Sequence, residues 1–308
     1  MLSTAVLSIC CTLVSAADAA ELGVKVDRNA AVEMRDGVIL RADVYRPDRG
    51  GPYPVLVRRS PYGKHFRSRR FPRYVKAGYI LVSQDARGRF DSDGKWESFM
   101  RAQTHDGEDG YDTVEWAAKL PGSTGKVGTL GISYNSFLQW RLAPLRPPSL
   151  VAMAAYSVMA RYTDLEGPGT IRPGRRLQWW IKTMAPDMHR RAKRPLPESY
   201  NQWVAADRDS WIHFLPWLEL PDEAFGHEAD AVKYWLRNPH TDPWKLDAGC
   251  KEIAVPNLDI VGWYDHANGD MLLYRTLVKE GKTETARNGS RIVIGPWSHV
   301  PLGVRRYG

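Results

Sequence analysis

The sequence predicts an α/β fold in which a mostly parallel central sheet carries helices on both faces. Short apolar runs rich in β-branched residues recur along the chain, and helix-like stretches lie between them. Asp36-Gly37, between the first two runs, is a two-residue hairpin signal, so the sheet is expected to open with an antiparallel pair. The 308 residues, 43% of them hydrophobic, suffice to bury a sizeable core.

Eight apolar runs are the predicted strands. They are Val32–Met34, Val38–Tyr45, Pro54–Arg58, Tyr79–Gln84, Val127–Gly131, Leu150–Tyr156, Val255–Gly262 and Arg291–Ile294. Helices are predicted over Arg69–Ala77, Gly110–Leu120 and Asn135–Leu145, because Gly78, Pro121-Gly122 and Pro147-Pro148 follow them as stop signals. The strand-to-helix turns then share one sheet edge, where ligands bind in open α/β sheets.

Residues 161–247 interrupt this alternation and are rich in Trp, Arg and Pro. We interpret them as a helical cap inserted into a core made of residues 20–160 and 248–308. Seven of the twelve tryptophans fall in the cap: Trp179, Trp180, Trp203, Trp211, Trp217, Trp235 and Trp244. Any one of them can belong to the cap's own core, and as a group they are expected to make the nearby pocket apolar and aromatic.

Residues 1–19 are predicted to be a signal peptide. An apolar run from Ala5 to Val14 precedes Ala17-Asp18-Ala19, which fits a signal-peptidase site, although no Lys or Arg stands before the run. The alternatives are a short membrane anchor or a misassigned start. A secreted or periplasmic protein without stable membrane insertion is expected, since no later segment approaches the ~18 apolar residues of a membrane span. Cys250 would be the single cysteine left after cleavage, so no intrachain disulfide is expected.

The chain is basic, with a formal net charge of +8, and much of the excess is local. One cluster contains Arg67, Arg69, Arg70, Arg73 and Lys76, and the other contains Arg190, Arg191, Lys193 and Arg194. Such clusters suit nucleic acid or an anionic surface, or they are solvated basic faces. No nucleic-acid-binding motif accompanies them, so we expect solvated faces and no nucleic-acid partner.

The strongest local motif is Gly131-Ile132-Ser133-Tyr134-Asn135-Ser136, which follows a predicted strand and precedes a predicted helix. This is the setting of a nucleophile elbow, the turn that exposes the serine of α/β-hydrolases above the sheet edge. Small flanking residues are needed because the turn is sharp and strained. The usual final glycine is replaced by Ser136, which is still small.

Asp265 and His299 follow in the chain order that an α/β-hydrolase triad requires. Asp265 closes the strand that ends at Gly262, and His299 lies in the loop after the last strand, so both are expected at the edge of Ser133. In isolation Asp265 could equally cap the next helix. Three other histidines, His266, His105 and His65, lack this placement in the sequence pattern.

These three residues suit acyl transfer. A serine hydroxyl becomes a good nucleophile when an imidazole removes its proton, and a carboxylate fixes the tautomer of that imidazole. The oxyanion that forms needs donors, and the N–H of Tyr134 is the expected first one.

Four segments together resemble the cocaine esterase and X-Pro dipeptidyl-peptidase-like (CocE/NonD) hydrolases. They are Arg59-Ser60-Pro61-Tyr62-Gly63-Lys64, Gln84-Asp85-Ala86-Arg87-Gly88-Arg89 with Ser92-x-Gly94, the serine motif with its Tyr134, and Gly262-Trp263-Tyr264-Asp265 with Gly295-Pro296-Trp297-Ser298-His299. The resemblance implies that the phenol of Tyr62 is the second oxyanion donor and that Asp85 and Arg87 are structural charges. It also implies that the family's C-terminal jelly-roll domain is absent from a chain ending at Gly308.

The sequence therefore predicts a serine hydrolase that cleaves a small-molecule ester, amide or peptide bond. An X-Pro dipeptidyl-peptidase-type aminopeptidase and a truncated, inactive binding module are the alternatives. Asp91 and Asp93 beside Gly94 partly match a calcium loop whose other ligand positions are unmet, so neither a metal nor another cofactor is expected. A homo-oligomer is left open.

Overall fold

Eight strands in two hydrogen-bonded groups form the framework of the part of the chain that the structure describes. The structure is a computed structural model that describes residues 22–162, 174–193, 215–238, 241–267 and 269–299. The larger group has the order β1-β2-β4-β3-β5-β6. Its strands are β1 (Val24–Glu33), β2 (Ile39–Pro47), β3 (Tyr53–Ser60), β4 (Ile80–Asp85), β5 (Ser123–Ile132) and β6 (Leu150–Tyr156). The second group is the parallel pair β7 (Leu258–Gly262) and β8 (Arg291–Gly295).

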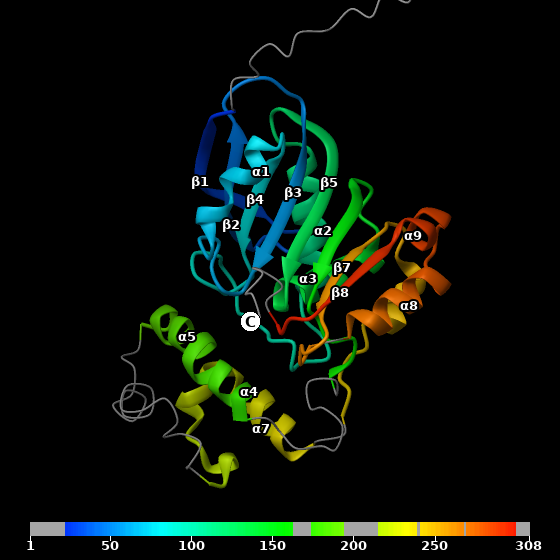
Figure 1. The fold of residues 1–308 in the computed structure, drawn as a ribbon. Helices are drawn as coiled ribbons and strands as arrows, with labels where there is room; N and C mark the ends of the chain where they lie inside the picture. Colours follow the sequence, from blue (N-terminus) through cyan, green and yellow to red (C-terminus); the bar gives the residue numbers. More distant parts are fainter. Residues whose placement is uncertain (1–21, 163–173, 194–214, 239–240, 268, 300–308) are drawn as a thin grey trace, which may run out of the picture.

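The two groups continue one another across the molecule (Figure 1). A parallel bridge joins Met153 of β6 to Asn257, just before β7, and the N–H of Met153 donates to the carbonyl of Pro256 at 2.9 Å. The strands from β4 to β6 run parallel, whereas β1–β2 and β2–β4 pair antiparallel. The predicted sheet is thus confirmed, and each predicted run overlaps a strand. Only β1 begins much earlier than predicted, because its polar first half lies on an exposed sheet edge.

Helices cover both faces of the sheet, as predicted. In β4, the neighbours Leu81 and Val82 point to opposite faces. Val82 belongs to a large apolar cluster to which α2, α3 and α8 contribute, and Leu81 belongs to a smaller one with α1. The four helices are α1 (Pro72–Lys76), α2 (Asp106–Ala118), α3 (Tyr134–Leu142) and α8 (Asp270–Glu280), and α9 (Glu284–Gly289) follows α8. Short 3-10 segments also occur at Ser68–Arg70, Ala143–Leu145 and Asp247–Glu252.

The segment predicted to be a cap lies beyond the carboxyl ends of β3 and β5 (Figure 1). It contains α4 (Gly174–Trp179), a π-helical turn (Trp180–Met184), α5 (Ala185–Arg191) and α7 (Ala229–Arg237), with 3-10 segments at Trp217–Glu219 and Asp222–Glu228. Residues 163–173, 194–214 and 239–240 of the expected cap, including Trp203 and Trp211, lie outside the described residues.

Buried contacts attach these helices to the loop that follows β4. The carboxylate of Glu228 accepts from the N–H of Ser98 at 3.1 Å and from its hydroxyl at 2.7 Å. The indole N–H of Trp244 donates to the carbonyl of Phe99. Trp180, Trp235 and Trp244 are almost fully buried in the large cluster, so these rings build a core, as expected for individual tryptophans.

Residues 1–19 lie outside the described residues, so the signal peptide remains a prediction. Within the described chain, no helix has both the length and the apolar composition that crossing a bilayer requires. Cys250 is a buried free thiol.

A buried carboxyl in β7 makes stability depend on pH. Asp259 is fully buried, and this burial raises the pKa of its carboxyl well above the ordinary 3.8; the nearby amide of Asn257 lowers the pKa only in part. Above that ordinary pKa the unfolded chain loses this proton while the folded chain keeps it. Ionisation therefore favours unfolding, and the stability due to the protonated carboxyl falls as the pH rises.

The variant Asp259→Asn removes this titration without changing the shape of the side chain. We expect its free energy of unfolding to exceed that of the parent protein by at least about 1 kcal/mol at pH 8, and by less at pH 5. Denaturant titrations at both pH values measure the difference. Asp93→Asn, at an exposed position, is the control. An Asp259→Asn effect that is the same at both pH values contradicts a buried, protonated carboxyl.

Candidate active site

Ser133 occupies a strained turn between β5 and α3. Its φ is 62° and its ψ is −125°, a region that residues with a side chain rarely adopt. The N–H of Ser133 donates to the carbonyl of Tyr156 at 3.0 Å, and its own carbonyl accepts from the N–H of Phe137 at 2.9 Å. The structure thus places Ser133 at the strand-to-helix turn that the motif predicts, with its side chain half-buried on a cavity.

Gly131, two residues before the serine, is a glycine because the helix turns back onto the strand. A Cβ atom on Gly131 would lie 2.5 Å from the Cβ of Asn135, which is too close for any side chain. Ser136, where the motif usually has glycine, is fully buried and its Cβ is accommodated. The departure from the motif therefore leaves the turn intact.

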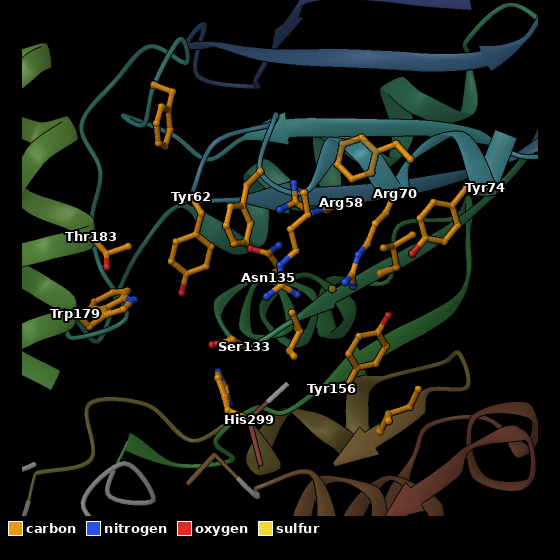
Figure 2. A pocket seen from close by; sticks show the side chains of 18 of the residues that line it. Arg58, Tyr62, Arg70, Tyr74, Ser133, Asn135, Tyr156, Trp179, Thr183 and His299 are labelled. Carbon is orange, nitrogen blue, oxygen red and sulfur yellow. The ribbon is translucent and has the colours of Figure 1, made fainter. Parts of the chain in front are cut away.

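Asp265 and His299 meet at the same edge of the sheet. The Nδ1 atom of His299 lies 2.9 Å from Oδ1 and 3.2 Å from Oδ2 of Asp265. Burial acts to raise the pKa of Asp265, but the His299 hydrogen bond and charge outweigh it, so the pKa lies below its ordinary value. An ionised carboxylate only accepts, so Nδ1 of His299 carries the proton and Nε2 is free to act as a base. Figure 2 shows this imidazole pointing toward Ser133.

A second histidine shares the carboxylate, which the sequence interpretation did not expect. His266 has its Nδ1 atom 3.2 Å from Oδ1 of Asp265, and its ring centroid is 4.3 Å from that of His299. The sequence pattern did not place His266 at this edge, and the structure does. The sequence feature that could have indicated this placement of His266 is its position directly after Asp265. His105 instead contacts Glu97, and His65 approaches Asp43.

The same three side chains could reach one metal ion. One ligand atom from each of Asp265, His266 and His299 lies within 4.8 Å of the others, and no other such group occurs in the described residues. The hydrogen bond of His299 and the ion-pair contact of His266 with the same carboxylate also account for this spacing. Asp91, which belongs to the partial calcium-loop match, accepts a hydrogen bond from the ammonium of Lys64.

Tyr62 directs its hydroxyl into the cavity near Ser133 (Figure 2). Burial raises the pKa of Tyr62, while the nearby groups of Trp179 and Ser133 partly oppose the shift, so the phenol stays protonated and can donate. Neighbouring bonds fix its backbone: the N–H of Tyr62 donates to the Ser60 hydroxyl at 3.1 Å, and Pro61 accepts from Arg89 at 2.9 Å.

Tyr134 contributes through its backbone and its ring. It is the first residue of α3, where backbone N–H groups have no acceptor within the helix. Its ring is buried among aromatic side chains, with centroids 5.1 Å from Phe99 and 6.3 Å from Trp179. That packing holds the start of the helix, and with it the N–H of Tyr134, against the site.

The charges near the sheet edge are structural, as the resemblance implies. Asp85 accepts from the ammonium of Lys64 at 3.0 Å. Arg87 bridges Asp109 at 2.6 Å and Asp36 at 2.8 Å, and all of these groups lie away from the cavity lining.

A cavity of about 770 Å³ surrounds Ser133. Tyr62, Trp179, His266 and His299 line it together with residues of the sheet, so one of the cap tryptophans does face the site. Arg67, Arg70 and Arg73 are exposed, as a solvated basic face requires, and they also line this cavity. In the second cluster, Arg190 pairs with Asp187 at 2.7 Å.

Comparison with known proteins agrees with this arrangement. A profile of the X-Pro dipeptidyl-peptidase (S15) family matches residues 36–301. The chain belongs to this family. It is 29% identical over 302 residues to the cocaine esterase of Rhodococcus sp. (strain MB1 Bresler), covering 90% of this chain and 49% of the esterase. The S15 chain thus spans about half the length of that curated relative.

Solved structures of similar shape support the fold. An aminopeptidase from a marine sediment Thaumarchaeota archaeon superimposes with a TM-score of 0.61 at 21% identity, covering 91% of this chain and 49% of that one. A CocE/NonD family hydrolase from Staphylococcus aureus also gives 0.61 at 21% identity, covering 87% and 46%. The α/β-hydrolase fold expected for this S15 chain is confirmed.

The strain at Ser133 can be measured. Glycine adopts the observed φ and ψ without strain, so Ser133→Gly should be more stable than Ser133→Ala by about 1 kcal/mol, since relief of about 1–3 kcal/mol outweighs the entropy of an added glycine. Thermal and denaturant unfolding of the two variants compare them directly. Equal stability of the pair contradicts a strained turn.

Proposed function

We propose that this chain is a serine hydrolase that cleaves an ester bond through an acyl-enzyme on Ser133. The observation that carries the proposal is the 2.9 Å contact between His299 and Asp265 on the cavity that also holds the strained serine. No part of this arrangement needs a cofactor.

In the proposed mechanism, Nε2 of His299 takes the proton of the Ser133 hydroxyl as Oγ attacks the ester carbonyl. Asp265 orients the imidazole and stabilises its positive charge. The phenol of Tyr62 and the N–H of Tyr134 donate to the oxyanion of the tetrahedral intermediate. The intermediate collapses, and His299 gives its proton to the departing alcohol.

Water completes the cycle. His299 removes a proton from a water molecule, whose oxygen attacks the acyl carbonyl, and the second intermediate releases the acid as Ser133 regains its proton. Each step moves one proton through the same imidazole, so the role of Asp265 is the same in both halves.

Ester hydrolysis is favoured over aminopeptidase action by the charge of the cavity. An aminopeptidase must accept the ammonium group of a peptide, which needs an acceptor or a carboxylate. No aspartate or glutamate lines the cavity within the described residues, whereas five arginines do. Export of the protein, with residues 1–19 as the signal, is part of the proposal.

An active serine should react with a fluorophosphonate probe. We expect labelling of the intact chain at Ser133, identified by peptide mass spectrometry, and none in Ser133→Ala. Absence of labelling in protein shown to be folded by circular dichroism supports the inactive binding module instead.

Two histidine variants form a matched control for this experiment. His299→Ala should lose turnover and most of the labelling rate, by about 10³-fold or more, whereas His266→Ala should keep most of both. The reverse order would make His266 the base.

The phenol of Tyr62 is tested by removing one oxygen atom. Tyr62→Phe should lower kcat for a 4-nitrophenyl ester by about 10²-fold with little change in KM, as expected for a donor that acts on the transition state. Tyr53→Phe, whose hydroxyl bonds to the carbonyl of Arg49 away from the cavity, should behave like the parent. A kcat unchanged by Tyr62→Phe removes the phenol from the mechanism.

A further inference from the structure

The cavity beside Ser133 has a strongly cationic wall. Five arginines line it: Arg58, Arg67, Arg70, Arg73 and Arg176. No carboxylate side chain lies among its lining residues in the part of the chain that the structure describes. An excess of cationic side chains along its wall attracts anions into the cavity.

Arg58 is the buried member of this wall. Only 6% of it is exposed, and its guanidinium donates to two neutral hydroxyls, those of Ser83 at 3.0 Å and Ser60 at 3.2 Å. Among the described residues it forms no ion pair, because Asp85, whose charge acts on it, is bound by Lys64. Burial lowers the pKa of Arg58 to about 10, so it is still charged at neutral pH. A buried cation without a contacting anion is costly, and an anionic ligand would offset this cost.

Arg70 approaches the same space from the turn before α1. Figure 2 shows its side chain reaching into the cavity between Asn135 and Tyr156, with Tyr74 beside it. Its guanidinium has neither a hydrogen bond nor an ion pair to any residue that the structure describes. Arg70 is exposed, so it can meet a ligand without rearrangement of the core.

We propose that the cavity binds a carboxylate of the substrate at Arg58 and Arg70 while Ser133 attacks the ester, so the preferred substrates are esters that also carry a free carboxylate. This inference rests on the proposed hydrolase function. A guanidinium presents parallel N–H donors that match the two oxygens of a carboxylate, and such charge-assisted hydrogen bonds strengthen where water is partly excluded. The hydroxyls of Tyr74 and Tyr156 lie on the same side of the cavity as further donors (Figure 2).

Matched substrate pairs test the proposal. Mono(4-nitrophenyl) adipate and its methyl ester place the charge on the acyl side, and 4-acetoxybenzoate and its methyl ester place it on the alcohol side. Each kcat/KM is divided by the rate constant of alkaline hydrolysis, which removes differences in intrinsic reactivity. We expect the carboxylate member of at least one pair to be preferred by about 10-fold, as expected for a charge-assisted hydrogen bond.

Arg70→Gln should bring this preference close to parity, whereas Arg69→Gln should keep it. Arg69 is an exposed arginine next in the chain that does not line the cavity, so it controls for the loss of net charge. Faster turnover of the methyl ester in both pairs, or a preference that survives in Arg70→Gln, overturns the proposal.

Ligand binding decides the question even if no ester is hydrolysed. Calorimetric titration with adipate should give binding that weakens in Arg70→Gln and persists in Arg69→Gln, and inorganic phosphate in a parallel titration distinguishes a carboxylate site from a general anion site. Binding of phosphate alone, or no binding of adipate, overturns the inference. Lack of Ser133 labelling with normal adipate binding overturns the hydrolase function and leaves the anion site standing.

Discussion

The parallel register of β7 and β8 is the constraint on which the site depends. Gly262 pairs with Gly295, and immediately afterwards the N–H of Trp263 donates to Gly295 at 2.8 Å and that of Tyr264 to Trp297 at 3.1 Å. These bonds tie the loop that bears Asp265 to the loop that bears His299. A Cβ atom on Gly262 would lie 2.1 Å from the carbonyl oxygen of Trp297, so the two loops close together only because this residue is glycine.

A second set of bonds brings the remaining wall of the site to that edge. Lys64 pairs with Asp85, and Arg89 donates to Met184 at 3.0 Å while its charge lies 3.5 Å from Asp187. The first contact holds the loop of Tyr62 to the end of β4, and the others hold the π-helical turn and α5 over it. These charges are buried and paired, so removing one partner would leave an uncompensated ion and displace the wall.

The cavity differs in kind from these networks. Arg58, which lines it, has hydroxyls and an aromatic ring as neighbours. Its guanidinium carbon lies 5.6 Å from the ring centroid of Phe71. Arg87, by contrast, has carboxylate partners. The proposed carboxylate site depends on this difference between Arg87 and Arg58.

The sequence alone determined the sheet, its antiparallel opening, and the strand ends at which Ser133, Asp265 and His299 would appear. These features follow from local periodicity, turn residues and the order of motifs along the chain, which are short-range properties. It did not reveal the polar first half of β1, because an edge strand with exposed side chains has little apolar pattern to detect.

Only the tertiary structure decided which side chains share a space. It placed His266 on the Asp265 carboxylate and turned Arg70 and Arg58 toward one cavity, although they come from different elements and look like ordinary basic residues in the sequence. The physical reason is that a charge acquires its role from its neighbours, and neighbours distant in the chain are set by packing and register rather than by local pattern.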